Sequence, residues 1–484
     1  MTIDIIHNEI LLLIFHFVRA TYLDPIHEDH KWRDEARWRL SWWHPIVHVC
    51  RNWRFVAFAS PNFLDLKLVC SHETPLELIG IWPPFPIIIK NTNRSLMPED
   101  YDFDAAFVHR DRICEIKIYL SSSQLQRLAP MMQEKFPALT HLGLDLDLLH
   151  NCRRTTPALP DGFLGGSAPS LKSLWLRSIP FPALPNLLLS TTGLVHLALV
   201  DLPYGGYISS EVIVTALAVL PNLESFTIEF MSPSSFPDWE TRHPLPQTRT
   251  ALPALTSFKF RGVSEYLEDF VARIDTPLLS SIHIAFFYQL IFDIPLLAQF
   301  MKRTTTLRAL SRVHVDFGHN SVCVGCHPPR RGLDQDSGLQ ILCAELDQQL
   351  LSLAQLFTLF FPSIYMVEHL YIYIQSLWKD NTESMQWLEF FHPFTAAKSL
   401  YVSKPFVQCI APALQKVARE CVTEVLPALE GIFLEGPRSS GPAQKVIGLP
   451  GELQEAIGQF VAARQLLGHP VAVFPWDRTV LDGR

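Results

Sequence analysis

Residues Pro137–Leu144, with the sequence PALTHLGL, decide the fold, because their pattern P-x-L-x-x-L-x-L recurs along most of the chain. Clear copies begin at Pro169, Pro221, Pro253, Pro277 and Pro427, and weaker copies without the proline span 113–118, 194–199, 310–315, 367–372 and 397–402. The first apolar positions at 113, 139, 171, 194, 223, 255, 279 and 310 are 23 to 32 residues apart. Self-similarity at such a period is typical of a repeat architecture.

Each copy predicts one short strand, because alternation in the L-x-L part sends both apolar residues to one face. Helix-length amphipathic stretches lie between the copies, several of them opened by a serine that can cap a helix N-terminus. The clearest such stretches are 122–135, 210–220, 264–274 and 294–303. The repeating unit is therefore a strand followed by a helix.

The spacing L-x-x-L-x-L at this period is that of a leucine-rich repeat. It predicts an α/β fold in which short parallel strands, backed by helices, form a curved solenoid. The alternative is an ordinary α/β domain with a parallel sheet, since βα units there also recur at about 30 residues. Such domains usually bind a nucleotide or small substrate, yet the chain holds no G-x-G-x-x-G, G-x-x-x-x-G-K-[ST] or G-x-S-x-G motif. We therefore expect a protein that is not an enzyme and holds no cofactor.

Several segments interrupt the pattern. Between the copies at 310 and 367 the gap of 57 residues predicts one degenerate repeat. The proline- and glycine-punctuated stretches 231–252 and 318–338 predict loops. Near the end, 436–442 reads as a linker, followed by a helix at about 450–467 and a strand at 470–474 that are expected to cap the last repeat.

Composition excludes several classes of protein. With 484 residues, 48% hydrophobic and 18% charged, the chain has ample apolar material for a folded core. A net charge of −8 with only short basic clusters argues against nucleic acid as a partner. The most apolar internal stretch, 284–300, contains Gln289, Asp293 and Pro295, so we expect no membrane span. The odd number of 9 scattered cysteines, without a leader sequence, favours a reducing compartment, cytoplasmic or nuclear.

Residues 1–70 lack the repeat and predict helices instead. In the first, at about 3–20, apolar residues recur at helical spacing, at Ile6, Ile10, Leu13, Ile14 and Phe17. A second helical segment, 44–60, is expected to stop at Pro61. Trp32, Trp38, Trp42, Trp43 and Trp53 are dense enough for a partner patch, with core packing of a small module as the favoured interpretation.

The motif residues of this segment are Ile6–Leu11 with Ile14 and Phe15, Trp43, Val49–Arg54 with Val56 and Ala57, and Ser60–Leu64. The sequence V-C-R-N-W-R, followed by S-P-N-F, resembles the F-box of mushroom-type fungal F-box proteins, and the repeats resemble the leucine-rich portion of those proteins. His7 stands where that pattern has a proline, and 22–40 is an insertion between the two motif halves.

The resemblance implies a substrate-recognition subunit of a Skp-cullin-F-box ubiquitin ligase. Its F-box docks on the Skp-type adaptor of the cullin complex, and its repeats bind a protein substrate of unknown identity. A module of this size cannot cover all its apolar side chains, so we expect adaptor docking through a defined set: Ile6, Ile10, Ile14, Phe15, Val49, Cys50 and Trp53. The alternative is that these residues pack only on one another or on the first repeat. The alternative function is a leucine-rich-repeat interaction scaffold with no ubiquitin ligase connection.

The expected organisation is an F-box-like module at 1–70, a connecting segment with an irregular first repeat at 71–112, degenerate leucine-rich repeats at 113–435, and a linker and cap at 436–484. Substrate recognition is expected at polar residues between the repeat leucines: Thr140, Lys172, Glu224, Thr256 and Ser280.

Two clusters resemble metal sites. The segment Cys323–His327 has the form C-x-x-C-H, with His319 and Cys343 nearby, but no second closely spaced ligand pair accompanies it. The segment His27–His30 is not H-E-x-x-H, and His44 and His48 fit solvent-facing or core histidines. We expect no metal at either place.

Overall fold

The fold was analysed in a computed structural model. The structure describes residues 6–23, 42–71, 78–81, 83–91, 99, 101–147, 156–236, 248–287, 294–304, 311–317, 321–327, 338–344, 350, 353–354, 357–358, 364–374, 384–420, 424–435 and 451–476. The segments His27–His30 and 436–442, together with Trp32 and Trp38, lie outside these residues. The chain forms two compact units, one made of Met1–Ile208, Val219–Leu223 and Ser234–Pro237, the other of Ser209–Ala218, Glu224–Pro233 and Asp238–Arg484. They are called the N-terminal and the C-terminal unit.

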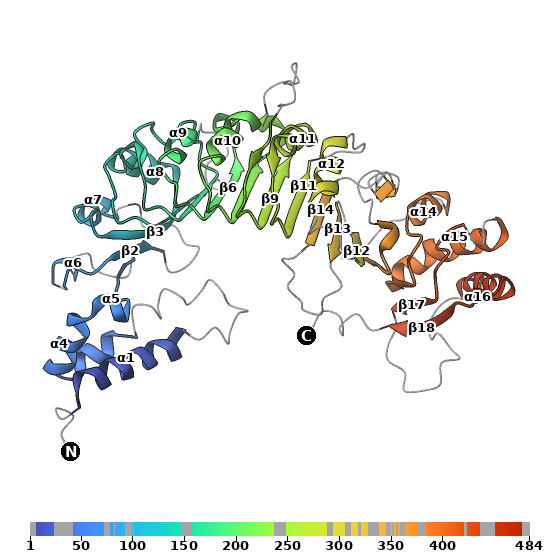
Figure 1. Ribbon diagram of the computed structural model, residues 1–484, viewed down its shortest axis with the longest axis horizontal. Coiled ribbons are helices and arrows are strands. Elements are labelled where there is room, and N and C mark those ends of the chain that lie inside the picture. Colours follow the sequence, from blue (N-terminus) through green and yellow to red (C-terminus); the bar gives the residue numbers. More distant parts are fainter. Residues whose placement is uncertain are drawn as a thin grey trace. The chain divides into compact units, whose positions relative to one another are not determined.

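The N-terminal unit begins with helices and continues as strand–helix repeats (Figure 1). Its helices are α1 (Asn8–Leu23), α3 (His44–Val49), α4 (Arg51–Ala59), α5 (Pro61–Leu64), α6 (Leu78–Ile81), α7 (Phe103–Phe107), α8 (Ser122–Met131) and α9 (Leu184–Leu188). Its strands are β1 (Leu68–Cys70), β2 (Ile87–Lys90), β3 (Ile113–Leu120), β4 (His141–Leu146), β5 (Ser173–Arg177) and β6 (His196–Leu202). Each strand pairs in parallel with the next one along the chain, as the repeat pattern predicts.

The C-terminal unit holds the remaining repeats. Its helices are α10 (Ser210–Leu217), α11 (Ser264–Arg273), α12 (Pro295–Arg303), α14 (Ser384–Phe391), α15 (Val407–Glu420) and α16 (Gly451–Leu466). Its strands are β7 (Ser225–Phe230), β9 (Ser257–Gly262), β11 (Ser281–Phe286), β12 (Arg312–Phe317), β13 (Ser321–His327), β14 (Gly338–Ala344), β15 (His369–Ile374), β16 (Ser399–Val402), β17 (Gly431–Glu435) and β18 (Ala472–Trp476). Two further strands, β8 (Thr250–Ala251) and β10 (Ile274–Asp275), pair with each other.

The predicted strand–helix units are confirmed in both units of the molecule. The helices predicted at 122–135, 210–220, 264–274 and 294–303 are α8, α10, α11 and α12. In β4 the leucines at 142, 144 and 146 are buried, and the equivalent alternate positions are buried in β5, β7, β9 and β11 as well. The helix caps differ by one residue from expectation, because Ser121 and Ser209, which precede the helices, accept the capping hydrogen bonds. The helix predicted at 450–467 and the strand at 470–474 are α16 and β18.

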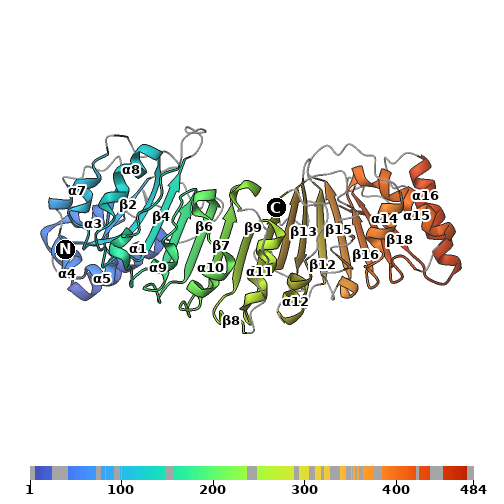
Figure 2. The ribbon, with the colours of Figure 1, turned by 90° about the horizontal axis from the view of Figure 1, so that it is seen from above.

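The expected degenerate repeat between 310 and 367 is not one repeat. The strand order there is β11-β14-β13-β12-β15, and β13 runs antiparallel to both of its neighbours. Residues 318–338, expected to be a loop, contain β13 and the first residue of β14. Antiparallel strands can be joined by a short connection, whereas parallel strands need a longer crossover, usually a helix. Two strands therefore fit into the stretch of sequence in which one strand and its crossover were expected. Figure 2 shows β13, β12, β15 and β16 side by side.

Candidate partner-binding surfaces

The helices α1, α3, α4 and α5 pack into a small module, here called the helical module. Its interior includes Leu11 and Phe15 of α1, which are fully buried. The Phe15 ring meets the half-buried Trp53 ring edge-on, with centroids 5.1 Å apart. Trp42 and Trp43 are also buried, as core packing of the tryptophans predicts. Phe15 and Trp53, expected to dock a partner, therefore stabilise the module itself.

The segment expected to form one helix over 44–60 is broken at Cys50. The Cys50 sulfur caps α4 by accepting a hydrogen bond from the backbone N–H of Trp53 at 3.5 Å. Pro61, expected to stop the segment, begins the short helix α5. Cys50 is half-buried, as is Ile6 at the start of the module, so neither side chain offers a broad apolar contact.

One stripe of α1 stays exposed. Ile10, Leu13, Ile14 and Phe17, here called the α1 face, have exposed fractions of 53%, 63%, 38% and 69%. Their spacing of i, i+3, i+4 and i+7 places them together on one side of the helix, beside the buried stripe. The expected docking residues Ile10 and Ile14 belong to this face. Leu13 and Phe17 were not among the expected docking residues, although their helical spacing already placed them with Ile10 and Ile14.

Further exposed apolar side chains lie on the other helices of the module. Val49 at the end of α3, which was predicted, is 48% exposed, and Phe55 of α4 and Phe63 of α5 are 67% and 51% exposed. The Phe63 ring lies 5.6 Å from the ring of His16 on α1. The module thus leaves large apolar side chains in solvent although it already has a packed interior.

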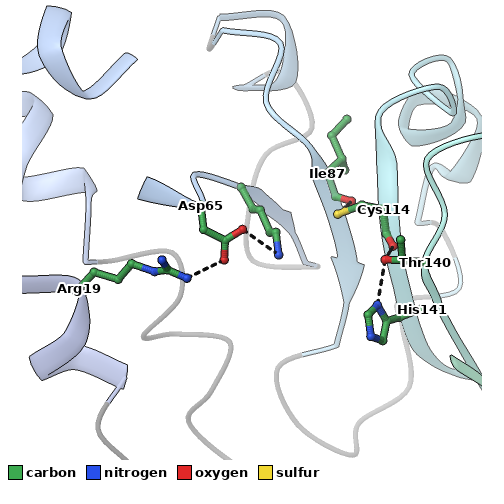
Figure 3. A network of polar contacts seen from close by, with 7 residues as sticks. Arg19, Asp65, Ile87, Cys114, Thr140 and His141 are labelled. Carbon is green, nitrogen blue, oxygen red and sulfur yellow. Dashed lines mark hydrogen bonds and ion pairs between the residues drawn. The ribbon is translucent and has the colours of Figure 1, made fainter. Parts of the chain in front are cut away.

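Aromatic and ionic contacts join the helical module to the first repeats. The rings of Trp43 and Phe58 lie 6.0 Å and 5.3 Å from that of Phe85, just before β2. Arg19 of α1 pairs with Asp65 at 2.9 Å, and Asp65 also pairs with Lys67 at 3.2 Å. Figure 3 shows the Arg19–Asp65 pair beside the next repeats. Within the N-terminal unit, α1 is therefore held by its buried stripe and by the ion pair of Arg19 near its C-terminal end. Among the described residues, the α1 face remains exposed.

The five expected substrate-binding residues share one structural position. Each of them immediately precedes a strand rather than lying within it, and Thr140 is half-buried while the other four are exposed. Their backbones link successive repeats, since Lys172 N–H donates to Thr140 O at 2.8 Å and Ser280 N–H to Thr256 O at 2.9 Å. The hydroxyl of Thr140 donates to Cys114 O at 2.9 Å (Figure 3). The structure groups Thr140 with Lys172 in one unit, and Glu224 with Thr256 and Ser280 in the other.

The residues that alternate with the core leucines lie one, three and five positions after these residues. In the first strands of the C-terminal unit they are mostly polar, and Lys259 of β9 pairs with Glu229 of β7 at 2.8 Å. In the N-terminal unit, Arg177 of β5 pairs with Asp201 of β6 at 2.9 Å. These strand-face residues were not singled out from sequence, although strict alternation within L-x-L identifies them.

The same face becomes aromatic over the last strands of the C-terminal unit. Successive stacked pairs of rings, here called the aromatic row, have centroids 4.3, 4.2, 4.4 and 5.1 Å apart. The row consists of His314, Tyr371, Tyr401, Phe433 and Phe474. Trp476 lies over it, with its ring 5.4 Å from that of Tyr401 and 5.6 Å from that of Tyr373. Burial among these rings raises the pKa of Tyr371.

The cysteine pair Cys323 and Cys326 lies in β13. Cys326 is fully buried in the core, which raises the pKa of its thiol, whereas Cys323 is half-buried. Residues three apart in a strand point to opposite faces, so these two sulfurs do not converge on one ion. Among the residues that the structure describes, no group of three or more His, Cys, Asp or Glu side chains could hold a metal ion. Within the same residues, no helix is long and apolar enough to cross a membrane.

Comparison with known proteins finds similarity among solved structures. No protein-family model matches the sequence, and no curated protein matches it. Among solved structures the chain is similar to the leucine-rich repeat-containing protein LegL7 from Legionella pneumophila, at 13% identity and a TM-score of 0.27, covering 72% of this chain and 90% of that one. The chain's own repeats and strand register therefore carry the assignment of an α/β fold built from leucine-rich repeats.

Proposed function

We propose that this chain is a substrate-recognition subunit of a Skp-cullin-F-box ubiquitin ligase. In this proposal the α1 face docks on a Skp-type adaptor, and the repeats bind a protein substrate. The observation that carries the proposal is the exposed stripe of four large apolar residues on a helix whose other apolar stripe is already packed. The sequence of the same module resembles an F-box, and this resemblance is the reason for proposing a Skp-type adaptor as the partner.

Burial of the α1 face gives a physical reason for docking. Apolar surface removed from water contributes roughly 25 cal/mol per Å², so several large side chains buried together supply a substantial part of a binding free energy. An amphipathic helix that lays such a stripe into an apolar groove is a recurrent mode of recognition, read as anchors at i, i+3, i+4 and i+7. Ile10, Leu13, Ile14 and Phe17 have this spacing.

The repeats supply the proposed substrate surface. Four of the five residues preceding the strands are exposed, and they are chemically varied, from Lys172 to Glu224. The strand faces change from polar to aromatic along the C-terminal unit. Rows of side chains on stacked repeats suit a protein ligand better than a small molecule, because they are spread over many strands. Phe474, which is 41% exposed, is the most accessible ring of the aromatic row.

Co-purification with a recombinant fungal Skp-type adaptor tests the proposal. The full chain is expected to retain the adaptor, and a variant with Ile10→Asp and Phe17→Asp is expected to lose it, because both changes place a charge in the docked stripe. The matched control is Leu466→Asp at the end of α16, where an equally apolar side chain is 88% exposed in the other unit. Full adaptor binding by the double variant, or none by the unaltered chain, contradicts the proposal and leaves the repeat scaffold without a ligase connection.

A further inference from the structure

Strand β18 is attached to the C-terminal unit less firmly than its neighbour β17. It is the last described strand of the sheet and pairs in parallel with β17 (Figure 1). The positions of β17 that face the core, Ile432 and Leu434, are buried. Their register partners in β18 are Val473, which is half-buried, and Pro475, which is exposed. β18 therefore lacks the buried apolar underside that fixes β17 in the core.

The contact that holds the end of β18 lies on its other face. Within β18 only Trp476 is buried, whereas Phe474 stacks on Phe433 and stays 41% exposed. Two strands, β16 and β17, lie between β15 and β18, yet the Trp476 ring is 5.6 Å from the ring of Tyr373 on β15. The indole thus reaches across two strands, and it meets the Tyr401 ring edge-on at 5.4 Å.

The row that Trp476 covers contains a polar group without a partner. Ser403, the residue after β16, donates its backbone N–H to Ile372 O at 2.9 Å. The register of the sheet therefore places Ser403 between Tyr373 and Trp476. Ser403 is 1% exposed, and its hydroxyl has no hydrogen-bond partner among the described residues. A buried hydroxyl without a partner costs free energy, which weakens the hold of Trp476 on this row.

We propose that β18 is an internal occupant of a peptide-binding site and that a segment of the protein substrate displaces it from β17. The inference rests on the part of the proposed function in which the repeats bind a protein. The displacing segment is an extended peptide with aromatic residues at i and i+2, like Phe474 and Trp476, because alternate residues of a strand share a face. It pairs with the edge of β17 that β18 now occupies and places its rings against Phe433 and Tyr401.

The elements around β18 stay in place when the strand leaves. The preceding helix α16 packs on α15, and Arg464 of α16 donates to Leu426 O at 2.7 Å. Val471, the residue before β18, is buried. The chain is therefore anchored up to Val471, and β18 can separate from β17 beyond that point.

A stability comparison tests whether Trp476 is a releasable contact or a core residue. Trp476→Ala in the full chain is expected to change the melting temperature by less than about 2 °C, because only β18 is released. The matched control, Trp387→Ala, removes a fully buried tryptophan of α14 and is expected to lower the melting temperature by about 5 °C or more. An equally large loss in both variants would make Trp476 part of the cooperative core and overturn the inference.

Peptide binding tests the displacement itself. The probe is a synthetic peptide with the sequence AVFPW of residues 472–476, observed by NMR. The W476A chain is expected to bind it, and the unaltered chain at least about tenfold more weakly, because its own β18 occupies the site. A peptide with alanine in place of the tryptophan is expected to bind neither chain. No binding by the W476A chain, or equal binding of the two peptides, overturns the inference. The adaptor takes part in neither assay, so such a result leaves adaptor docking to its own test.

Discussion

The helices α1 and α11 bury their apolar residues to very different extents. In α11, Tyr266, Leu267, Phe270 and Val271 are all fully buried. In α1, Leu11 and Phe15 are equally buried, whereas the four residues of the α1 face stand in solvent. Both helices are rich in large apolar side chains, so their composition does not account for the difference.

The difference lies in the neighbours of the two helices. α11 packs on β9 and lies between α10 and α12, so it is covered on several sides. Its buried charges have partners as well, since Glu268 accepts hydrogen bonds from α12 and Arg273 pairs with Asp269 at 3.0 Å. α1 contacts α4 and α5. A repeat array covers its internal helices by stacking, whereas the four residues of the α1 face remain exposed.

The largest predicted effect is in α11. Phe270→Ala is expected to lower the free energy of unfolding by about 3–5 kcal/mol, because it opens a cavity in a close-packed core. The Phe270 ring lies 5.7 Å from that of Phe226 and 5.2 Å from that of Phe258. Urea denaturation followed by circular dichroism measures the loss. A change below about 1 kcal/mol would mean that α11 is not packed as described.

A smaller loss is expected when the link between two repeats is cut. The Glu268 carboxylate accepts hydrogen bonds from the backbone N–H groups of Leu296 and Leu297, at 2.9 and 2.7 Å, and so caps α12, which has no side-chain cap of its own. Glu268→Ala is expected to cost about 1–3 kcal/mol in the same denaturation assay. Glu268→Gln retains an acceptor oxygen and is the matched control. Equal losses in both variants would show that the carboxylate charge, not the cap, matters.

Acid is expected to weaken the fold modestly. Burial is the largest cause that lowers the pKa of His44, His141 and His369 from the ordinary value of 6.5. The unfolded chain then binds more protons than the folded one as pH falls below about 6.5, so the free energy of unfolding decreases there. The urea midpoint is expected to fall between about pH 7.5 and about pH 5.5, above the range in which carboxylates titrate. His141→Gln should make the midpoint less sensitive to pH; an unchanged slope argues against a role for this histidine.

The smallest predicted effect on stability is in the α1 face. Phe17→Ser is expected to change the free energy of unfolding by less than about 0.5 kcal/mol, because the side chain is 69% exposed. Phe15→Ala, two residues away on the buried stripe, is expected to cost about 3–5 kcal/mol. The paired denaturation curves test whether α1 has one structural and one exposed stripe. Similar losses in both variants would contradict that division.

The repeat architecture was predictable because the pattern is local. A strand of the form L-x-L and an amphipathic stretch of ten residues each carry their own periodicity, so β4, α8 and α11 follow from the sequence. The β13–β14 hairpin was not predictable, because β14 pairs with β11 and takes the place that β12 would otherwise have. Strand pairing over such a separation depends on which apolar faces meet, and no short pattern encodes it.

The proposed docking surface was predictable only in part. Helical spacing identifies the apolar residues of α1, but Ile10 and Ile14 were chosen for docking because they belong to the F-box-like motif of a module too small to cover all its apolar side chains. The sequence does not say which of two adjacent stripes a helix buries, so Phe15 was included and Phe17 was not. The aromatic row was missed for a similar reason. Tyr371, Tyr401 and Phe433 are far apart in the chain, and only the strand register brings them together.

Hydrogen exchange of the chain with and without a Skp-type adaptor tests the central claim most directly. The account predicts that the adaptor slows amide exchange in peptides from α1 and leaves peptides from α11 unchanged. The chain with Ile10→Asp and Phe17→Asp is expected to show no protection at the same adaptor concentration. Protection confined to the repeats, or no protection in the unaltered chain at saturating adaptor, would contradict the claim that the α1 face is a docking surface.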